Sequence, residues 1–392
     1  MEKTDKTTRI LDPENCEMCG MCTTVCPTYA IAHNESESPR GRISIIYGLN
    51  NSILKPSKSA LKHINSCTLC LACETICPAK VNFYQLMTGA RNKYFRDQSL
   101  IFKIKTKLIS KIFTNEILKK IIKIIIKLLN KEKLKKINTV FFKFMNYTQI
   151  KKNKNQTNIK KFNKKNIGIF TGCVIDVFQE NIGINCANIL RKKNINSELI
   201  KNIKCCGSLD YNNGRFAEGL KHNKLTVNEF KKNKYEIIIG CGSGCSAFLN
   251  KNKGNVNYQD ATSYIIDLLE NSKNNFKTTF KNICVHQPCT SKLAEINFSK
   301  LLKVLKTIPY LKVFTFKENY CCGAGAQNLI HNYENALNII EPKIKFIEDN
   351  HINEILTYNI GCSLNFINSI NLKKIKQVEV SHPITFLNER LI

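Results

Sequence analysis

The sequence lacks the features that mark several common classes of protein. No uninterrupted apolar stretch reaches the roughly 18–20 residues that a membrane-spanning helix needs, so we predict that the chain does not cross a membrane. The first residues are polar and of mixed charge, unlike a secretory signal peptide. Neither a glycine-rich phosphate loop of the dinucleotide type nor a group of catalytic bases is present, which argues against substrate chemistry on this chain.

Acidic residues are also few. The chain has 60 Lys and Arg against 30 Asp and Glu, which gives a formal net charge of +30. Residues 101–165 contain 20 lysines against only Glu116 and Glu132, so 18 of these positive charges lie in that segment. Binding to nucleic acid would suit such a charge, but no base-reading motif accompanies the lysines. We therefore predict that the chain has no nucleic-acid partner.

The basic segment has a regular pattern. Lysines recur there at every fourth residue, at Lys119, Lys123, Lys127, Lys131 and Lys135. Ile and Leu fill most of the positions between them. This spacing predicts an amphipathic helix with a basic stripe. Such a helix fits an anionic membrane surface, a neighbouring subunit, or the solvated side of an ordinary core helix, and the sequence leaves these three interpretations open.

Cysteine, by contrast, is abundant. The chain has 19 cysteines, eight of them in residues 1–98, none in residues 99–165 and eleven in residues 166–392. They are clustered at short spacings. In the reducing cytoplasm where we place this chain, such clusters indicate metal ligands or redox thiols rather than disulfides.

Two copies of one motif account for the first eight cysteines. They are Cys16-x2-Cys19-x2-Cys22-x3-Cys26-Pro27 and, beginning 40 positions after Pro27, Cys67-x2-Cys70-x2-Cys73-x3-Cys77-Pro78. Three thiolates of such a motif bind one [4Fe–4S] cluster, and the fourth reaches the other cluster. We therefore assign one cluster to Cys16, Cys19, Cys22 and Cys77, and the second to Cys26, Cys67, Cys70 and Cys73. Zinc is the alternative, but it usually takes two separated cysteine pairs and needs no third cysteine.

The other half of the chain contains an internal repeat. The first copy has Gly172-Cys173, then 31 residues, then Cys205-Cys206-Gly207 and, after 38 residues from Cys206, Cys245. The second copy has Pro288-Cys289, again 31 residues, then Cys321-Cys322-Gly323 and, after 39 residues from Cys322, Cys362. This agreement indicates a duplication. We refer to the two copies as the CCG domains.

Short apolar runs alternate with helical patterns in each CCG domain. The expected strands are 167–170, 237–239 and 256–258 in the first copy and 283–286, 355–358 and 378–380 in the second. The expected helices are 176–193, 215–232, 261–269 and 383–391. Such alternation predicts parallel α/β units, in which ligands gather beyond the carboxyl ends of the strands. The cysteines fall close to those ends.

The CCG cysteines form a further candidate metal or redox site in each copy. Adjacent cysteines are poor disulfide partners but can both bind one polynuclear site. The candidate ligands are Cys173, Cys205, Cys206 and Cys245, and Cys289, Cys321, Cys322 and Cys362. Alternatively, these residues are retained as buried thiols. Cys241 and Cys284 lie outside the repeat, Cys186 fits a helix core, and hydrogen-bonding roles explain His286 and His382.

With these motifs in place, the chain resembles the iron–sulfur subunits of bacterial glycolate oxidase. The resemblance rests on Cys16–Tyr29, Pro39–Arg42, Cys67–Pro78, His286–Thr290, Cys321–Gly323 and Asn359–Cys362. Subunits of anaerobic glycerol-3-phosphate dehydrogenase and heterodisulfide reductase share the architecture. The latter end each CCG domain in a Cys-x2-Cys pair and hold a non-cubane cluster there. Here Gly242 and Asn359 take the first position of that pair, so an additional cluster is left open.

The resemblance implies an α+β multidomain protein. An α-helical ferredoxin domain (1–98) and a basic helical connector (99–165) would precede two α/β CCG domains (166–271 and 280–392). It further implies two [4Fe–4S] clusters, an FAD-containing dehydrogenase subunit and another flavin-type subunit as partners, and electron flow from glycolate oxidation towards a membrane quinone pool. The protein would then lie in the cytoplasm, peripherally on the inner membrane. Oxidation of D-lactate or glycerol 3-phosphate by the complex, or disulfide reduction at a CCG site, are the alternatives.

Overall fold

The computed structural model describes residues 15–128, 167–200, 205–232, 235–316, 321–325 and 328–392. The chain forms two compact units, and each is discontinuous in sequence. The first unit consists of Met1–Ser110, Leu209–Gly219 and Tyr320–Ile340. The second consists of Lys111–Ser208, Leu220–Asn319 and Glu341–Ile392. The two N-terminal cysteine motifs therefore share a unit with two short segments of the C-terminal half.

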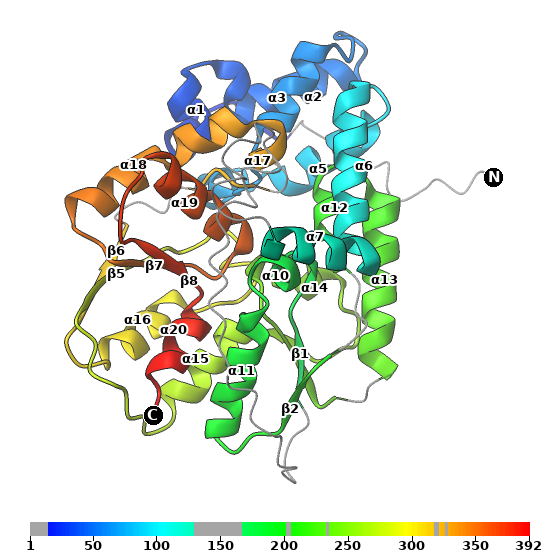
Figure 1. The fold of residues 1–392 in the computed structure, drawn as a ribbon. Coiled ribbons are helices and arrows are strands. Elements are labelled where there is room, and N and C mark those ends of the chain that lie inside the picture. The colour runs from blue at the N-terminus through cyan, green and yellow to red at the C-terminus, as the bar shows by residue number, and fades with distance from the viewer. Residues whose placement is uncertain (1–14, 129–166, 201–204, 233–234, 317–320, 326–327) are drawn as a thin grey trace. The chain divides into compact units, whose positions relative to one another are not determined.

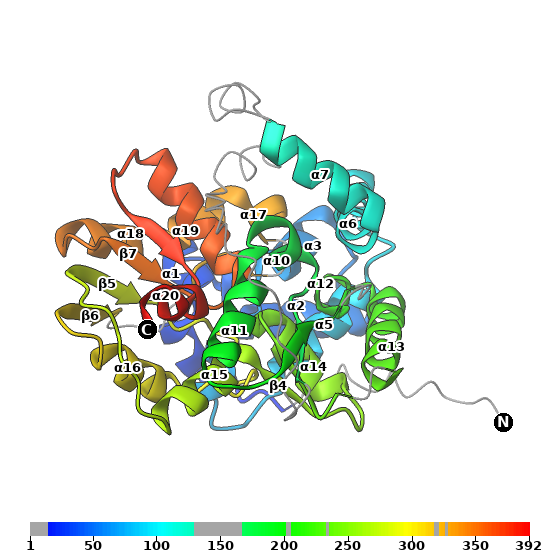
Figure 2. The same ribbon diagram turned by 60° about the horizontal axis from the view of Figure 1, so that its bottom comes forward.

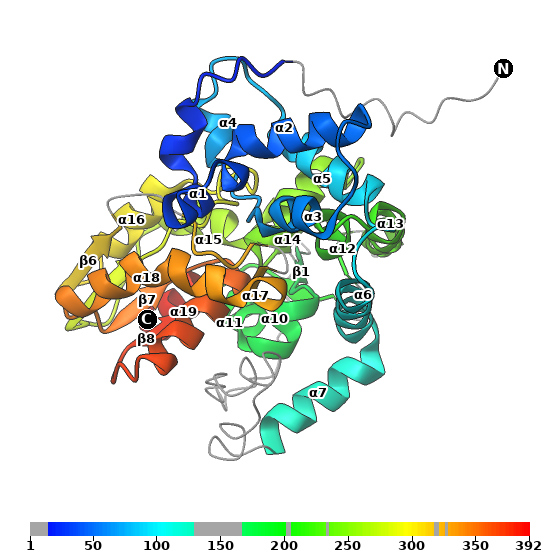
Figure 3. The ribbon, with the colours of Figure 1, turned by 90° about the horizontal axis from the view of Figure 1, so that it is seen from above.

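The first unit is built from short helices. They are η1 (Met21–Val25), α1 (Pro27–Ala32), η2 (Glu35–Glu37), α2 (Pro39–Asn50), α3 (Lys58–Ser66), α4 (Ala72–Ile76), α5 (Phe83–Lys93), most of α6 (Leu100–Thr114), α12 (Ser208–Asn212) and α17 (Asn328–His331). The helices α2, α3 and α5 contact one another, and Figure 3 shows them side by side. Ile46, Ile64 and Met87 are fully buried between them and form the core of this unit.

Helix α2 begins where the sequence places its start signals. Pro39 occupies the first turn, and the Ser38 hydroxyl accepts a hydrogen bond from the Gly41 amide at 2.9 Å. Gly41 is required because a Cβ there would lie 1.9 Å from the Glu35 carbonyl oxygen. This close approach fixes the turn that carries Arg40 and Arg42.

The second unit contains two four-stranded parallel sheets with the same strand order. The first sheet runs β2-β1-β3-β4, and the second runs β6-β5-β7-β8. The strands are β1 (Ile167–Phe170), β2 (Ser197–Leu199), β3 (Ile237–Gly240), β4 (Tyr258–Asp260), β5 (Lys281–Val285), β6 (Leu311–Thr315), β7 (Glu354–Leu356) and β8 (Glu379–Ser381). Matching topology confirms that the repeat in the sequence is a structural duplication.

Helices cover both sheets. They are α10 (Cys173–Phe178), α11 (Asn181–Lys192), α13 (Phe216–Lys232), α14 (Ser243–Asn252), α15 (Ala261–Glu270), α16 (Phe298–Lys306), α18 (Tyr333–Asp349), α19 (Ile360–Leu372) and α20 (Pro383–Arg390). In Figure 1 the strands of the second sheet lie between α16 and α20 on one side and α18 and α19 on the other. Burial on both faces explains why the central strands β1 and β3 contain no polar side chain.

The two copies pair through corresponding helices. Helix α11 of the first copy contacts α20 of the second, and α16 of the second contacts α15 of the first (Figures 1 and 2). A single hydrophobic core joins them and includes Ile189, Ile265, Leu301 and Phe386. At its centre the buried Asn185 amide donates to Thr385 Oγ1 at 3.0 Å and accepts from Asn388 at 3.0 Å. Each copy therefore closes the core of the other.

The sequence-based elements agree with the structure at most positions. All six expected strands exist, although β4, β5, β7 and β8 are shifted by one or two residues. The edge strands β2 and β6 were not predicted, because neither has the continuous apolar run of a central strand. The helix expected over 176–193 is interrupted at Gln179 and Glu180, which separate α10 from α11.

The basic connector contains α7 (Glu116–Leu128), which covers the first part of the predicted amphipathic helix; Lys131 and Lys135 lie outside the described residues. Lys119 is only 4% exposed and contacts Glu116 at 2.6 Å and Asp176 at 3.6 Å. Lys123 pairs with Asp176 at 2.9 Å. These two lysines therefore attach α7 to α10 and do not form a solvated basic stripe. Among the described helices, none combines the length and the apolarity that crossing a membrane requires.

The pairing of the copies predicts the effect of truncating Asn185. Asn185→Ala leaves the buried Asn388 and the partly buried Thr385 without these hydrogen bonds, so the free energy of unfolding should fall by about 1–3 kcal/mol. Asn188→Ala is the matched control, because Asn188 is half-buried on the same helix and bonds only to Arg191 of that helix. Urea denaturation followed by circular dichroism under anaerobic conditions measures both. Equal losses in the two variants would show that this contact does not hold the copies together.

Candidate metal centres

Both N-terminal cysteine motifs use the same backbone device. In the first motif Met18 and Gly20 have φ values of 51° and 83°, and in the second Leu69 and Leu71 have φ values of 53° and 60°. These four residues occupy equivalent positions between the cysteines. Left-handed backbone is costly for Met and Leu, and such strain is held at functional sites by the surrounding structure. The repeated turns direct the thiols of each motif towards a common hollow.

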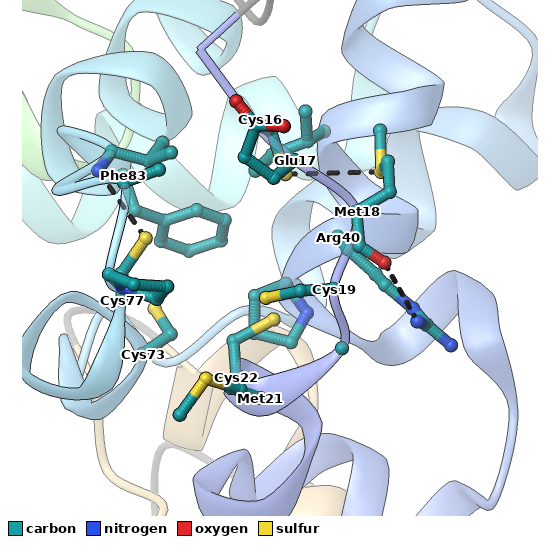
Figure 4. Close-up of a pocket in the computed structure, with 16 residues that line it drawn as sticks. Cys16, Glu17, Met18, Cys19, Met21, Cys22, Arg40, Cys73, Cys77 and Phe83 are labelled. Atoms are coloured by element: carbon teal, nitrogen blue, oxygen red, sulfur yellow. Dashed lines mark hydrogen bonds between the residues drawn. The ribbon is translucent and has the colours of Figure 1, made fainter.

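The first hollow contains the first predicted ligand set. Cys16, Cys19, Cys22 and Cys77 line about 460 Å³ of empty space, together with Cys73 (Figure 4). Its rim faces solvent, because Cys19 is exposed and Met18 and Met21 are 43% and 47% exposed. The Val81 amide donates to Cys77 Sγ at 3.5 Å. Cys77 comes from the second motif, so this hollow joins both motifs.

The second hollow contains the second predicted set. Cys26, Cys67, Cys70 and Cys73 line about 280 Å³ of empty space, with Arg42 beside them. Cys26, Cys67 and Cys73 are buried, unlike the exposed Cys19 of the first hollow. The Leu69 amide donates to Cys67 Sγ at 3.4 Å. We call the two groups the exposed centre and the buried centre.

The spacing of the thiols suits clusters better than single ions. Within the described ranges, no three His, Cys, Asp or Glu side chains converge as the ligands of one metal ion would. A zinc ion needs its sulfur ligands at about 2.3 Å from one point, whereas a four-iron cluster binds each thiolate through a different iron. The hollows lined by separated thiols fit the second requirement.

Burial disfavours the ionised form of these thiols. Burial raises the pKa of Cys22, Cys67 and Cys73, so an empty site would favour the neutral thiols. Cluster binding needs the thiolates, and the positive charge of iron stabilises them. Two buried guanidinium groups, those of Arg42 and Arg91, act against the effect of burial at Cys67.

Arg42 connects the two motifs around the buried centre. Its guanidinium donates to Thr28 Oγ1 at 3.0 Å, to Ser66 Oγ at 2.9 Å and to the Glu37 carboxylate at 2.6 Å. Thr28 Oγ1 in turn lies 3.2 Å from Cys26 Sγ, and Ser66 precedes Cys67. Sequence reasoning assigned no role to Arg42, which belongs to one of the stretches that match the glycolate oxidase subunits. Its position between two cysteine motifs was the available signal.

A cysteine of the second CCG domain also lies at the buried centre. A hydrogen bond with Cys321 raises the pKa of the Cys70 thiol well above its usual value, and burial of the thiol raises this pKa further. Gly325 packs so closely on the second motif that a Cβ there would lie 2.2 Å from the Thr68 carbonyl oxygen. Spacing along the chain could not reveal this contact, because Cys321 is 251 positions from Cys70.

The four candidate cysteines of the first CCG domain lie together in the second unit. Cys173 Sγ lies 3.4 Å from Cys205 Sγ, and Cys206 hydrogen-bonds to both Cys205 and Cys245. Hydrogen bonds from Cys173 and Cys206 hold the pKa of Cys205 well below its usual value. Gly172, with φ +85°, leaves room for Cys245, whose Sγ would lie 3.3 Å from an added Cβ. This arrangement can bind a metal or act as a redox thiol group.

The corresponding residues of the second copy are divided between the compact units. Cys321 and Cys322 belong to the first unit, whereas Cys289 and Cys362 belong to the second. The Gly323 amide donates to Cys321 Sγ at 3.3 Å, as the Gly207 amide donates to Cys205 Sγ at 3.4 Å. The two Cys-Cys-Gly turns are therefore alike. A metal site formed by the second quartet stays a prediction.

The remaining cysteines and histidines considered from the sequence lie in the core or take part in structural hydrogen bonds. Cys186, Cys241 and Cys284 are fully buried, and the first two belong to the core of the paired copies. His286 Nδ1 lies 3.1 Å from Thr357 Oγ1, and His382 Nδ1 accepts from the Ile384 amide at the start of α20. The hydrogen-bonding roles expected for the two histidines are confirmed.

Family models match three parts of the chain. A "4Fe-4S dicluster domain" matches residues 12–81, and a "Cysteine-rich domain", abbreviated CCG, matches residues 167–250 and 283–367. The first match includes all eight cysteines of the two hollows. The second includes both copies of the repeat. The [4Fe–4S] clusters predicted from the motifs, and the fold class, are thereby confirmed.

Curated relatives match between about half and nine tenths of the chain. The glycolate oxidase iron–sulfur subunit of Escherichia coli is 23% identical, with 88% of each chain covered. The probable glycolate oxidase iron–sulfur subunit of Bacillus subtilis is also 23% identical, covering 89% of this chain and 87% of its own. Lactate utilization protein A 2 of Bacillus cereus is 25% identical over 55% of this chain and 95% of its own. This chain thus belongs to the iron–sulfur proteins that combine a 4Fe-4S dicluster domain with two CCG cysteine-rich domains.

Proposed function

We propose that this chain is the iron–sulfur electron-transfer subunit of a glycolate oxidase, the complex that converts glycolate to glyoxylate. The observation that carries the proposal is the pair of neighbouring hollows in the first unit, each lined by cysteines of both motifs. The sequence similarity to glycolate oxidase iron–sulfur subunits over most of the chain supports the substrate.

The eight cysteines of the first unit have defined roles in this proposal. Cys16, Cys19, Cys22 and Cys77 hold the exposed cluster, and Cys26, Cys67, Cys70 and Cys73 hold the buried one. When bound, each cluster accepts and releases one electron at a time. The chain supplies the thiolates, buries three of the four ligands of the buried centre, and fixes both sites in one unit.

The partners follow from this role. An FAD-containing dehydrogenase subunit would oxidise the hydroxy acid, a further flavin-type subunit would complete the complex, and electrons would leave towards the membrane quinone pool. The exposed rim of Cys19, Met18 and Met21 is the part of the exposed centre that a donor can approach. Flavoproteins that oxidise D-lactate or glycerol 3-phosphate are the alternative partners, and the lactate utilization relative supports the former.

The CCG domains serve as docking and redox modules in this proposal. The domain bounds that we propose are 1–98, 99–165, 166–271 and 280–392. The four thiols around Cys205 in the first copy can hold an additional cluster. They also support a second candidate function, disulfide reduction at the CCG site, because the lowered pKa of Cys205 favours a nucleophilic thiolate.

Each proposed cluster takes three ligands from one motif and its fourth ligand from the other. Variants in different motifs should therefore lose the same cluster. Cys22→Ser and Cys77→Ser should both lose the exposed cluster, whereas Cys26→Ser and Cys70→Ser should both lose the buried one. Each loss should lower the iron content from about eight to about four atoms per chain. Iron and sulfide analysis with low-temperature electron paramagnetic resonance (EPR) measures this. Cys284→Ala, at a buried cysteine outside both hollows, is the control and should keep all the iron.

The same variants report on function in the assembled complex. Cys22→Ser should abolish transfer to an artificial acceptor downstream while substrate still reduces the flavin of the partner. If Cys77→Ser instead removed the signal that Cys26→Ser removes, the ligand sets would be wrong. Full acceptor-linked activity without the exposed cluster would contradict electron transfer through this chain.

Iron content also tests the first CCG domain. If this domain holds a further cluster, anaerobically purified protein should contain clearly more than about eight irons, and Cys206→Ala should remove only the excess. Cys186→Ala, at a buried cysteine of the core, should remove none. About eight irons in both the parent and Cys206→Ala would assign Cys205 and its neighbours as thiols.

Peripheral association with the inner membrane has a candidate surface on α7. Ile117, Ile121 and Ile124 are exposed at helical spacing, and Lys120 is exposed beside them. Ile121→Asp should reduce co-sedimentation with anionic phospholipid vesicles at least threefold. Leu372→Asp is the control, because Leu372 is about equally exposed on α19. Equal binding by both variants and the parent would remove α7 as the contact.

A further inference from the structure

Arg91 is a cation buried beside the buried centre. It lies on α5, its relative exposure is 4%, and among the described residues its guanidinium donates to backbone carbonyl oxygens alone. Nη2 donates to the Cys67 carbonyl at 2.6 Å and to the Ile64 carbonyl at 3.1 Å, and Nη1 donates to the Asn212 carbonyl at 2.9 Å. The charge is therefore fixed directly behind a proposed cluster ligand.

No carboxylate neutralises this charge within the residues that the structure describes. The other buried arginines of the described residues have acidic partners: Arg42 pairs with Glu37 at 2.6 Å, and Arg390 pairs with Glu389 at 3.2 Å. Burial lowers the pKa of Arg91 to about 10, so the group is still charged at neutral pH. A buried charge without a counter-charge is strongly unfavourable. Something other than a carboxylate must compensate it.

The cysteines of the buried centre provide the opposite charge. Four thiolates around a [4Fe–4S] core leave a net negative charge, which increases by one on reduction. The Arg91 guanidinium donates to the Cys67 carbonyl at 2.6 Å, so its positive charge lies beside this ligand. Net charge and hydrogen bonding around a cluster set its reduction potential.

The structure thus assigns a role to Arg91. We propose that Arg91 is the fixed counter-charge of the cluster held by Cys26, Cys67, Cys70 and Cys73, and that it raises the reduction potential of that cluster. Loss of water around a buried cluster disfavours an added electron, and the guanidinium opposes this effect. The proposal rests on the ligand sets given under the proposed function, and it adds the residue that keeps the buried cluster reducible.

At the exposed centre, solvent can compensate the negative charge of a cluster. Its rim is open to solvent, and water screens the charge there. The nearest arginine, Arg40, is partly exposed and pairs with Glu35 at 2.6 Å. A change at Arg91 should therefore act on one cluster and leave the other nearly unchanged.

Redox titration followed by EPR tests this assignment on the full chain with both clusters bound. At the potential that half-reduces the buried cluster of the parent, Arg91→Gln should lower its ratio of reduced to oxidised form at least tenfold. This equals a downward shift of about 59 mV for a one-electron couple. The exposed cluster should not shift. Arg91→Lys keeps the charge and should stay close to the parent.

A second variant covers the case in which Arg91→Gln does not assemble the cluster. Asn212→Asp is nearly isosteric and adds a negative charge on the residue whose backbone carbonyl accepts from Arg91 at 2.9 Å and whose side chain accepts from the Tyr84 hydroxyl at 2.8 Å, so it should shift the buried cluster in the same direction. Loss of the buried cluster in Arg91→Gln but not in Arg91→Lys would also support the counter-charge. Unchanged potentials in Arg91→Gln, or in Asn212→Asp where the former lacks the cluster, would overturn it.

Failure of the proposed function would look different. If Cys67→Ser kept both EPR signals in otherwise unmodified protein, the ligand sets themselves would be wrong. If Cys67→Ser removed the buried signal while Arg91→Gln left its potential unchanged, only the role of Arg91 would be wrong.

Discussion

Holding thiolates inside a protein is the constraint on which the first unit depends. Burial opposes ionisation of Cys22, Cys67 and Cys73, yet cluster binding requires it. Bound iron would stabilise the thiolates at both centres, and at the buried centre the guanidinium groups of Arg42 and Arg91 add further positive charge. Arg42 and Arg91 are both almost completely inaccessible, and their hydrogen bonds reach the segments that carry Cys26 and Cys67. Packing and electrostatics are therefore parts of one solution.

The first unit is completed by segments from both CCG domains. Gly214, with φ +80°, approaches Arg91 so closely that a Cβ would lie 2.3 Å from the Arg91 carbonyl oxygen, and Gly325 meets Thr68 in a similar way. Each glycine follows a Cys-Cys-Gly turn of the repeat. Within the first unit, the ferredoxin region is thus packed against one short segment from each CCG domain, and Cys321 of the second segment lies beside Cys70.

The duplication also explains the second unit. Two sheets with one topology place Cys173 and Cys289 just beyond the carboxyl ends of β1 and β5, the position at which parallel α/β sheets present ligands. Helices α11 and α15 of the first copy pack against α20 and α16 of the second, and this packing buries apolar helix faces that each copy would otherwise expose. The first copy brings four thiols together, and hydrogen bonds among them favour the Cys205 thiolate. This half of the chain combines a structural role with a chemical one.

Local spacing was enough to identify the cysteine motifs, the two candidate ligand sets, the duplication and the central strands, because these depend on residues close together in the chain or on regular periodicity. Spacing could not locate β2 and β6, whose pairing depends on neighbours rather than on apolar runs. Nor could it show that Lys119 is buried in ion pairs rather than solvated. Arg91 and Cys321 meet the buried centre only because distant segments pack together, and burial and charge compensation are properties of that packing. The sequence by itself therefore determined which residues can bind metal, and the tertiary structure decided which charges surround them.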